Sequence, residues 1–147
     1  MLDTIDRRIV SALARNARMS LKELAAAVGL SSPSAAERLK RLEERGVIRG
    51  FTIDVDPTAL GYPLQAMVRI RPLPGKLQRV QELLAQIPEI VECDKVTGDD
   101  CFIARMVVRN IDALDTLLDR ISDKAETNTA IVKAHTVPRR LPPLGPA

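Results

Sequence analysis

The stretch SLKELAAAVGLSSPSAAERLKRLEERGVI, residues 20–48, decides the fold of the first part of the chain. Ser20 precedes an apolar-periodic run and Glu23 follows three residues later, a capping-box pattern that satisfies backbone N–H groups at the start of a helix. Gly29 ends this helix, because glycine adopts a left-handed conformation at little cost. Ser31 is a good N-cap for a second helix. The stretch therefore predicts two short helices joined by a tight turn.

The second helix, over residues 32–45, has an apolar side for packing and a polar side for solvent or a partner. Ala35, Leu39 and Leu42 share one face at roughly 100° per residue. A helix with polar side chains near its N-terminal end fits the major groove of DNA, but many surface helices look the same. The complete order is more specific: a capped helix, a glycine turn, a Ser-capped basic helix, and then GVI opening a strand. This order predicts a DNA-binding winged helix-turn-helix.

The predicted DNA contacts lie on the polar side of this helix. Arg41 could bond a guanine edge or a phosphate, and Glu37 could accept from a cytosine amino group or orient Arg41 as an i,i+4 partner. Ser32 and Ser34 are expected to bond phosphate and position the helix. Arg38 lies at the edge of the packed face. The predicted DNA-binding residues are Ser32, Ser34, Glu37, Arg38, Lys40 and Arg41.

Composition narrows the classes of function. A chain of 147 residues is one domain or two small ones. With no Trp, one Tyr and two Phe, the core must be aliphatic, and base stacking on single-stranded nucleic acid is not expected. The net charge is +3, and residues 15–49 hold 8 Lys or Arg against 4 Asp or Glu. This local excess supports phosphate contact only modestly, because a solvated surface can show the same balance.

The chain lacks the residue patterns of metal, disulfide, catalytic and membrane proteins. Cys93 and Cys101 have neither a disulfide framework nor metal-ligand spacing, and we expect reduced residues in a core or an interface. His135, the single histidine, is expected on a strand face or at an interface. No apolar run reaches the length of a membrane span, and the N-terminus lacks a signal-peptide pattern. We predict a cytoplasmic protein without metal, cofactor or catalytic residues.

The elements around the helix-turn-helix follow from periodicity. Residues 2–16 read as a helix that packs over it. Residues 47–55 alternate between apolar and polar, and predict a short wing or a linking strand. Residues 57–63 contain Pro and Gly and read as a linker.

The second part of the chain predicts a βαββαβ order. Strands are expected over residues 65–71, 90–97, 101–109 and 127–137, and helices over 77–87 and 111–121. With both helices on one face of the sheet, this is a ferredoxin-like arrangement, so the fold class is α+β. The predicted organisation is a DNA-binding domain (1–56), a linker (57–63), a ferredoxin-like domain (64–137) and a Pro-rich tail (138–147) that cannot extend a ladder.

Five motifs together resemble the Lrp/AsnC family of bacterial and archaeal transcription regulators. They are LDTIDRRI, LAAAVGLS, SAAERLKRLEERGVIRGF, DPTALGY and VTGDDCF, and they span nearly the whole chain. The resemblance implies a winged helix-turn-helix joined to an αβ sensing domain called RAM. It also implies dimers formed through the sheet that often associate further, commonly to octamers, and a nucleoid-associated protein. Many members bind an amino acid or related small molecule between RAM domains, which changes assembly or DNA affinity.

The turn of residues 97–101 matches the family's glycine-acid loop. A glycine there lets backbone N–H groups approach a ligand carboxylate, and an aspartate could meet an α-ammonium group. A plain hairpin turn, with Gly98 at positive φ and solvated aspartates, is the alternative. The chain reads DDC where well-known amino-acid-responsive members tend to carry an aromatic followed by Asp, which leaves the ligand's identity open. The predicted effector-binding residues are Thr97, Gly98, Asp99, Asp100, Cys101, Thr127 and Thr129.

Two other functions fit parts of the pattern. A chromosome-organising protein would wrap double-stranded DNA around an oligomer with little sequence preference and no ligand. Sirohaem decarboxylases resemble the family in both domains, so the fold by itself does not exclude an enzyme. An enzyme of that kind needs several acid–base or haem-handling residues in one cavity, and this chain has a single His. We therefore expect a ligand-tuned regulator of transcription.

Overall fold

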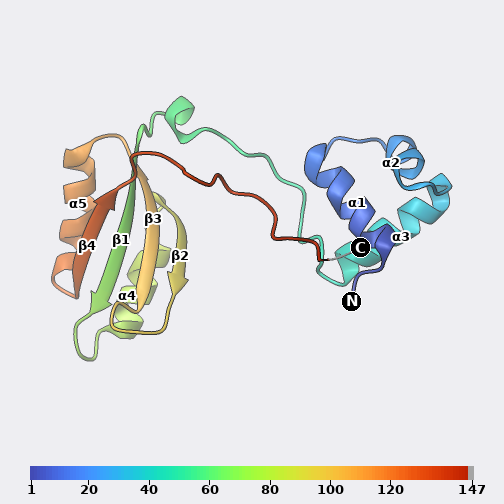
Figure 1. Ribbon diagram of the computed structural model, residues 1–147. Helices are drawn as coiled ribbons and strands as arrows, with labels where there is room; N and C mark the ends of the chain where they lie inside the picture. Colours follow the sequence, from blue (N-terminus) through green and yellow to red (C-terminus); the bar gives the residue numbers. More distant parts are fainter. Residues whose placement is uncertain (146–147) are drawn as a thin grey trace. The chain divides into compact units, whose positions relative to one another are not determined.

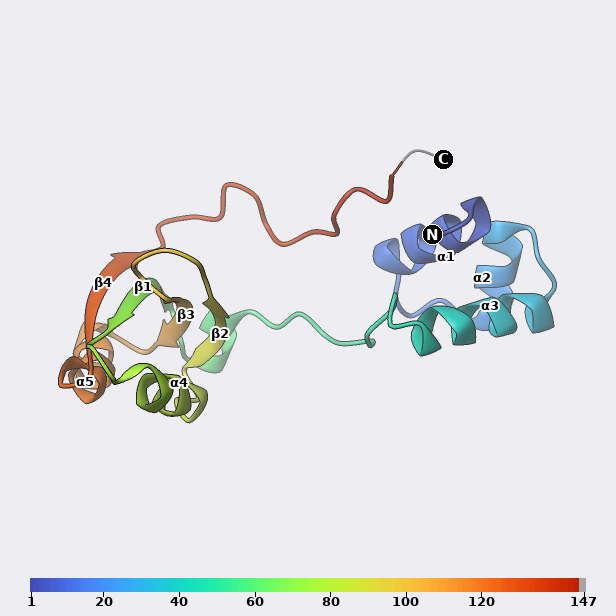
Figure 2. The ribbon, with the colours of Figure 1, turned by 90° about the horizontal axis from the view of Figure 1, so that it is seen from below.

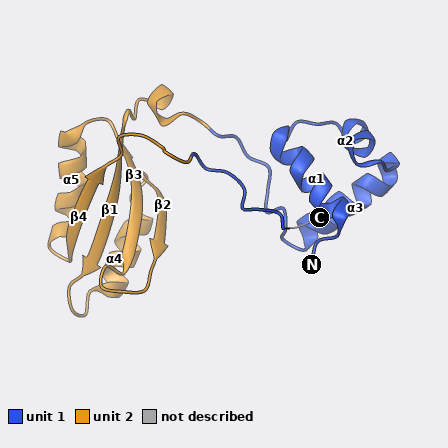
Figure 3. Ribbon diagram, in the orientation of Figure 1, with its two compact units in different colours: residues 1–54, 138–147 blue, residues 55–137 orange. Residues whose placement is uncertain are grey.

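The computed structural model describes residues 1–145, and the chain forms two compact units (Figures 1 and 3). The first unit comprises Met1–Asp54 with the tail from Pro138, and the second comprises Val55–Val137. The first is built of helices and the second of a four-stranded sheet with two helices. In the described residues, no helix is long and apolar enough to cross a membrane.

Three helices form the first unit: α1 (Thr4–Arg15), α2 (Leu21–Val28) and α3 (Ser32–Glu44). The capping box of α2 is confirmed: the Glu23 N–H donates to Ser20 Oγ (3.1 Å) and the Ser20 N–H donates to Glu23 Oε2 (2.7 Å). Gly29 ends α2 at φ 74°, and Ser31 caps α3. Because these signals are local, the sequence alone predicted the helix-turn-helix.

A small aliphatic core holds the three helices together. Ile9 of α1, Leu24 of α2 and Leu42 of α3 are each at most 2% exposed. Burying such a side chain stabilises the fold by about 1.5–3 kcal/mol. Because Leu42 faces this core and Ala35 is also fully buried, the opposite side of α3 faces solvent.

The predicted strand at residues 47–55 is wrong for the single chain. Residues 49–56 have no regular secondary structure. A strand needs a ladder partner, and no described segment of the chain pairs with this one. As a result its alternating apolar side chains stay open to solvent, with Ile53 81% exposed and Phe51 50% exposed.

The second unit is a ferredoxin-like sheet, as predicted. Its elements are β1 (Leu64–Pro72), α4 (Leu77–Ala85), β2 (Ile90–Lys95), β3 (Phe102–Val108), α5 (Ile111–Ser122) and β4 (Ala125–Ile131), preceded by a 3-10 turn, η1 (Pro57–Leu60). The strand order is β2-β3-β1-β4 and the three pairings are antiparallel. Figure 2 shows α4 and α5 on the same side of the sheet.

Alternation along β1 separates the core from the open face of the sheet. Ala66, Val68 and Ile70 are fully buried beneath the helices, as the pattern predicted. Arg69 and Arg71 point to the other face, because successive side chains of a strand alternate.

The last strand is shorter than predicted and begins earlier. β4 pairs with β1 from Ala125, opposite Pro72, to Ile131, opposite Ala66. Since β1 starts at Leu64, the chain runs out of partner positions soon after Ile131, and the strand ends. His135 is therefore exposed beyond β4, and its predicted place on a strand face is wrong.

Candidate nucleic-acid interface and effector loop

The exposed side of α3 carries most of the predicted DNA contacts. Ser34, Glu37, Lys40 and Arg41 are exposed, and Ser32 is half-buried in the first turn. These residues project from one capped helix, so the core that holds α3 also sets their directions. The helix presents hydroxyl, carboxylate, ammonium and guanidinium groups, which suit both base edges and phosphates.

Two ion pairs along α3 are exposed and easily exchanged. Arg41 Nε donates to Glu37 Oε1 over 3.0 Å, and Lys40 Nζ lies 3.6 Å from Glu44 Oε1. The side chains in these pairs are 57–70% exposed. Exposed i,i+4 pairs contribute only about 0.3–0.5 kcal/mol, so a phosphate or base can displace either carboxylate at little cost. Glu37 orients Arg41 in this structure, and its contact with a base stays a prediction.

The serines at the start of α3 are partly used by the helix itself. Ser31 Oγ accepts the N–H of Ser34 (3.3 Å) and donates to Ser34 Oγ (2.9 Å). The Ser34 hydroxyl keeps its own proton for donation, since a hydroxyl both donates and accepts. It can therefore still bond a phosphate oxygen.

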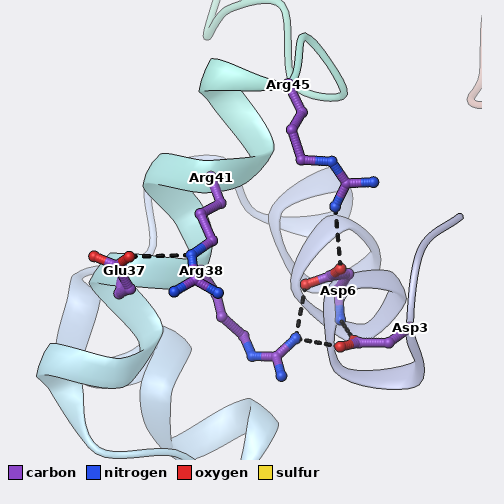
Figure 4. A network of polar contacts seen from close by, with 6 residues as sticks. All are labelled: Asp3, Asp6, Glu37, Arg38, Arg41 and Arg45. Carbon is purple, nitrogen blue, oxygen red and sulfur yellow. Dashed lines mark hydrogen bonds and ion pairs between the residues drawn. The ribbon is translucent and has the colours of Figure 1, made fainter.

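Arg38 differs from the other predicted contacts, because its guanidinium turns toward α1 (Figure 4). Its Nη1 donates to Asp6 Oδ1 over 3.0 Å and also to Asp3 Oδ2. Arg45, the C-cap residue of α3, has its Nη1 3.9 Å from Asp6 Oδ2. We call Asp3, Asp6, Arg38 and Arg45 the α1–α3 ion cluster.

The charges of this cluster stabilise one another. The hydrogen bond from Arg38, followed by the one from the Asp6 N–H, lowers the pKa of the Asp3 carboxyl, and desolvation opposes this shift. The bonds to Asp3 and then Asp6 raise the pKa of the Arg38 guanidinium. Sequence reasoning missed Asp6 as part of the site. The available signal was two aspartates three residues apart in the LDTIDRRI motif, ahead of an arginine-rich helix.

The predicted effector loop is a strained turn between β2 and β3. Thr97, Gly98 and Asp99 are exposed, while Asp100 and Cys101 are half-buried. Gly98 has φ 101°, as a hairpin glycine should, but Cys101 also has positive φ at 56°. The Val96 N–H bonds Cys101 O at 2.7 Å and closes the turn.

Arg71, which the sequence analysis did not single out, joins this loop. Its Nη2 lies 3.8 Å from Asp100 Oδ1, with both side chains partly exposed. The turn thus gathers a guanidinium, carboxylates and a glycine backbone from β1 and the β2–β3 connection. These groups have the charges that would meet the carboxylate and the ammonium of an amino acid.

The structure does not bring the two β4 threonines to this loop within one chain. Thr127 and Thr129 pair with Ile70 and Val68 of β1. β1 lies between β4 and β3, so two strand spacings, about 10 Å, separate β4 from the strand that follows the loop.

A separate apolar cavity of about 310 Å³ lies between α4 and β2. Its lining includes Leu84, Ile87, Val91 and Cys93, and none of the predicted effector residues. Cys93 is exposed and forms no disulfide. The sequence analysis expected it in a core or in an interface, and the core placement is wrong. Partial desolvation of its thiol and then the Asp94 carboxylate raise the pKa of Cys93.

Comparisons with known proteins cover both units. Residues 2–49 match the winged helix-turn-helix DNA-binding family, and residues 65–142 match the Lrp/AsnC ligand binding domain. The HTH-type transcriptional regulator FL11 of Pyrococcus furiosus is 36% identical over 146 residues, which cover 97% of each chain. The HTH-type transcriptional regulator LrpA of Mycobacterium tuberculosis is 38% identical over 129 residues, 87% of this chain and 86% of the relative.

Solved structures give the same result. LrpC of Bacillus subtilis superposes with a TM-score of 0.86 at 28% identity, covering 91% of this chain and 96% of LrpC. A feast or famine regulatory protein of Mycobacterium tuberculosis, complexed with L-methionine, superposes with a TM-score of 0.88 at 35% identity. The latter match covers 96% of this chain and 98% of the relative.

Proposed function

This chain belongs to the Lrp/AsnC family of transcriptional regulators, and we propose that it binds specific operators and that an amino acid or related metabolite tunes this binding. The observation that carries the proposal is the pairing of an exposed polar helix, α3, with a ligand-binding domain in one chain. Binding to chromosomal DNA would place the protein at the nucleoid.

For DNA, the proposed contacts are the exposed residues of α3. Arg41 and Lys40 supply charge to phosphates or guanine edges, and Glu37 either orients Arg41 or accepts from cytosine. Ser32 and Ser34 position the helix on the backbone. The support is that these residues lie on one capped helix, exposed except for the half-buried Ser32, and that solvent or DNA can replace the ion-pair partners of Lys40 and Arg41.

For the effector, the proposed site is the loop Thr97–Cys101 with Arg71. Arg71 and the glycine backbone would bind a carboxylate, and Asp99 or Asp100 would bind an ammonium group. A relative in complex with L-methionine supports an amino acid as the ligand class. Thr127 and Thr129 would complete such a pocket only from another copy of the chain, which is consistent with a dimer and with higher assembly, up to an octamer.

The proposal is tested first on DNA. The full chain selects sequences from a random duplex pool, and DNase footprinting then maps the selected sites. We expect a few discrete protected sites, and no retardation by a folded Lys40→Ala/Arg41→Ala variant, because charged contacts dominate DNA affinity. Broad protection without preferred sites would instead identify a chromosome-organising protein.

The ligand is tested by a thermal-shift screen of amino acids and related metabolites. A ligand that binds the folded state raises the Tm by mass action. We expect at least one amino acid to do so and to change the footprint. If no amino acid shifts the Tm at millimolar concentration, the proposed ligand class is wrong, while DNA binding is judged separately.

A further inference from the structure

We propose that Asp6, with Asp3, is a positioning residue for DNA recognition: it holds Arg38 and so orients α3 on α1, and Arg38 itself does not contact DNA. The inference rests on the proposed operator binding and names how the DNA-binding surface is held in place. It changes the role of Arg38, which the sequence analysis predicted as a DNA contact, and it adds Asp6, which the sequence analysis did not single out.

Burial distinguishes Asp6 from the other acidic residues of this unit. It is 7% exposed and is the one buried charged residue within 1–145. Both of its carboxylate oxygens face arginines of α3 and its C-cap: Oδ1 faces Arg38 and Oδ2 faces Arg45. A buried carboxylate persists in a fold only when it is paired in this way.

Asp3 couples the same arginine to the start of α1. Its Oδ1 accepts the N–H of Asp6 (2.8 Å) as the N-cap of the helix, while its Oδ2 accepts from Arg38. The first turn of α1 and the middle of α3 are thus tied by a single guanidinium. The partial positive charge at the N-terminus of α1 favours both carboxylates further.

The packing of α3 shows why this link matters for orientation. α3 packs more extensively on α2 than on α1. The ion cluster lines a polar hollow of about 220 Å³ between α1 and α3, and it adds polar bonds between these two helices to the aliphatic contacts of their shared core. Rotation of α3 about its contact with α2 would break these bonds and would redirect the side chains of Lys40 and Arg41.

Arg38 is poorly available to DNA because its guanidinium is held by Asp3 and Asp6. Its side chain is 31% exposed, against 64% for Arg41 and 70% for Lys40. To reach a phosphate it would have to give up its hydrogen bond to Asp6, whose buried carboxylate would then keep only the longer 3.9 Å contact with Arg45, and this is unfavourable. The exposed pairs along α3 have no such constraint, so the helix divides into contact residues and a positioning residue.

The test compares operator and random duplexes, by fluorescence anisotropy over a range of salt, for the full chain and four variants: Asp6→Asn, Arg38→Met, the double variant, and Arg41→Ala. Asp6→Asn and Arg38→Met change the net charge in opposite directions. Positioning predicts that both lower operator affinity about tenfold, and that the double variant is no weaker than either single one. Random-DNA affinity and the salt slope change little, whereas Arg41→Ala lowers both affinities and reduces the slope by about 1.

Glu44→Gln is the matched control, because it removes an exposed ion pair from the same helix. It should keep the ratio of operator to random affinity. Circular dichroism checks folding at the assay temperature, and if Asp6→Asn does not fold, Arg38→Met and the milder Arg38→Lys carry the test. A fall in salt slope for Arg38→Met, or unchanged operator affinity for the folded variants, overturns the proposal. If the unmodified chain does not prefer the operator, the proposed function has failed instead.

Discussion

Cys101 shows how a single backbone angle sets the geometry of the effector loop. An L-residue in the left-handed region costs roughly 1–2 kcal/mol, and Cys101 sits there at φ 56°. Contacts around it compensate: the N–H groups of Val96 and Phe102 both bond carbonyl oxygens within the turn, and the Cys101 side chain packs on the core of its unit. Strain of this kind gathers at functional loops, which fits the proposed site.

At residue 101, a glycine variant should be more stable than an alanine variant, which is the reverse of the usual order of stability. We expect Cys101→Gly to be more stable than Cys101→Ala by about 1 kcal/mol, because glycine adopts positive φ without strain while alanine keeps the strain. Urea unfolding of both variants, with equal m-values, measures the difference. An alanine variant as stable as the glycine variant would show that the loop relaxes to negative φ.

At the scale of elements, the caps determine where each helix of the DNA-binding unit begins. Ser20 and Glu23 each bond the other's backbone N–H at the start of α2. The Asp3 side chain accepts a backbone N–H at the start of α1, and the Ser31 side chain accepts one at the start of α3. An N-cap side chain satisfies a donor that the helix itself leaves free. The direction of α2, and with it the turn into α3, depends on such bonds.

The cap of α2 can be tested without touching the DNA face. Ser20→Ala should lower the free energy of unfolding of this unit by about 1 kcal/mol, since it removes the acceptor for the Glu23 N–H. Ser20→Thr keeps a hydroxyl and should lose much less. Chemical denaturation followed by circular dichroism compares the two, and equal losses would mean that the hydroxyl contributes nothing.

At the scale of the molecule, two units with separate cores divide the proposed work. The aliphatic core of α1–α3 and the core beneath the sheet share no residue. No core residue therefore couples an effector bound at the second unit directly to the helices of the first. We propose that dimers present two copies of α3 to roughly palindromic DNA.

This symmetry predicts a dependence on half-site spacing. Half-sites on selected operators should lie about one helical turn, 10–10.5 bp, or a multiple apart, because the two copies of α3 enter successive major grooves. Inserting about 5 bp between them turns one half-site to the opposite side of the duplex and should abolish high-affinity binding. Inserting a full turn is the control. Equal affinity for all spacings would indicate that single units bind independently.

Much of the fold was determined by the sequence alone, because its signals are local. The capping box at Ser20, the glycine at the end of α2 and the alternation of Ala66, Val68 and Ile70 each act within a few residues. They predicted three N-terminal helices, the βαββαβ order and the polar side of α3, and motifs over nearly the whole chain resembled the correct family.

Only the tertiary structure decided which partners distant residues find. β4 ends where β1 offers no further residues to pair with, and residues 49–56 have no strand to pair with. The fold also brings Arg71 of β1 close to Asp100 of the effector loop. It also turned Arg38 toward Asp3 and Asp6, 35 and 32 residues earlier, while Arg41 stayed outside. A helical period places both arginines near the edge of one face. The packing of α1 against α3 determines which arginine is held by the carboxylates of α1 and which stays exposed on the outer side of α3.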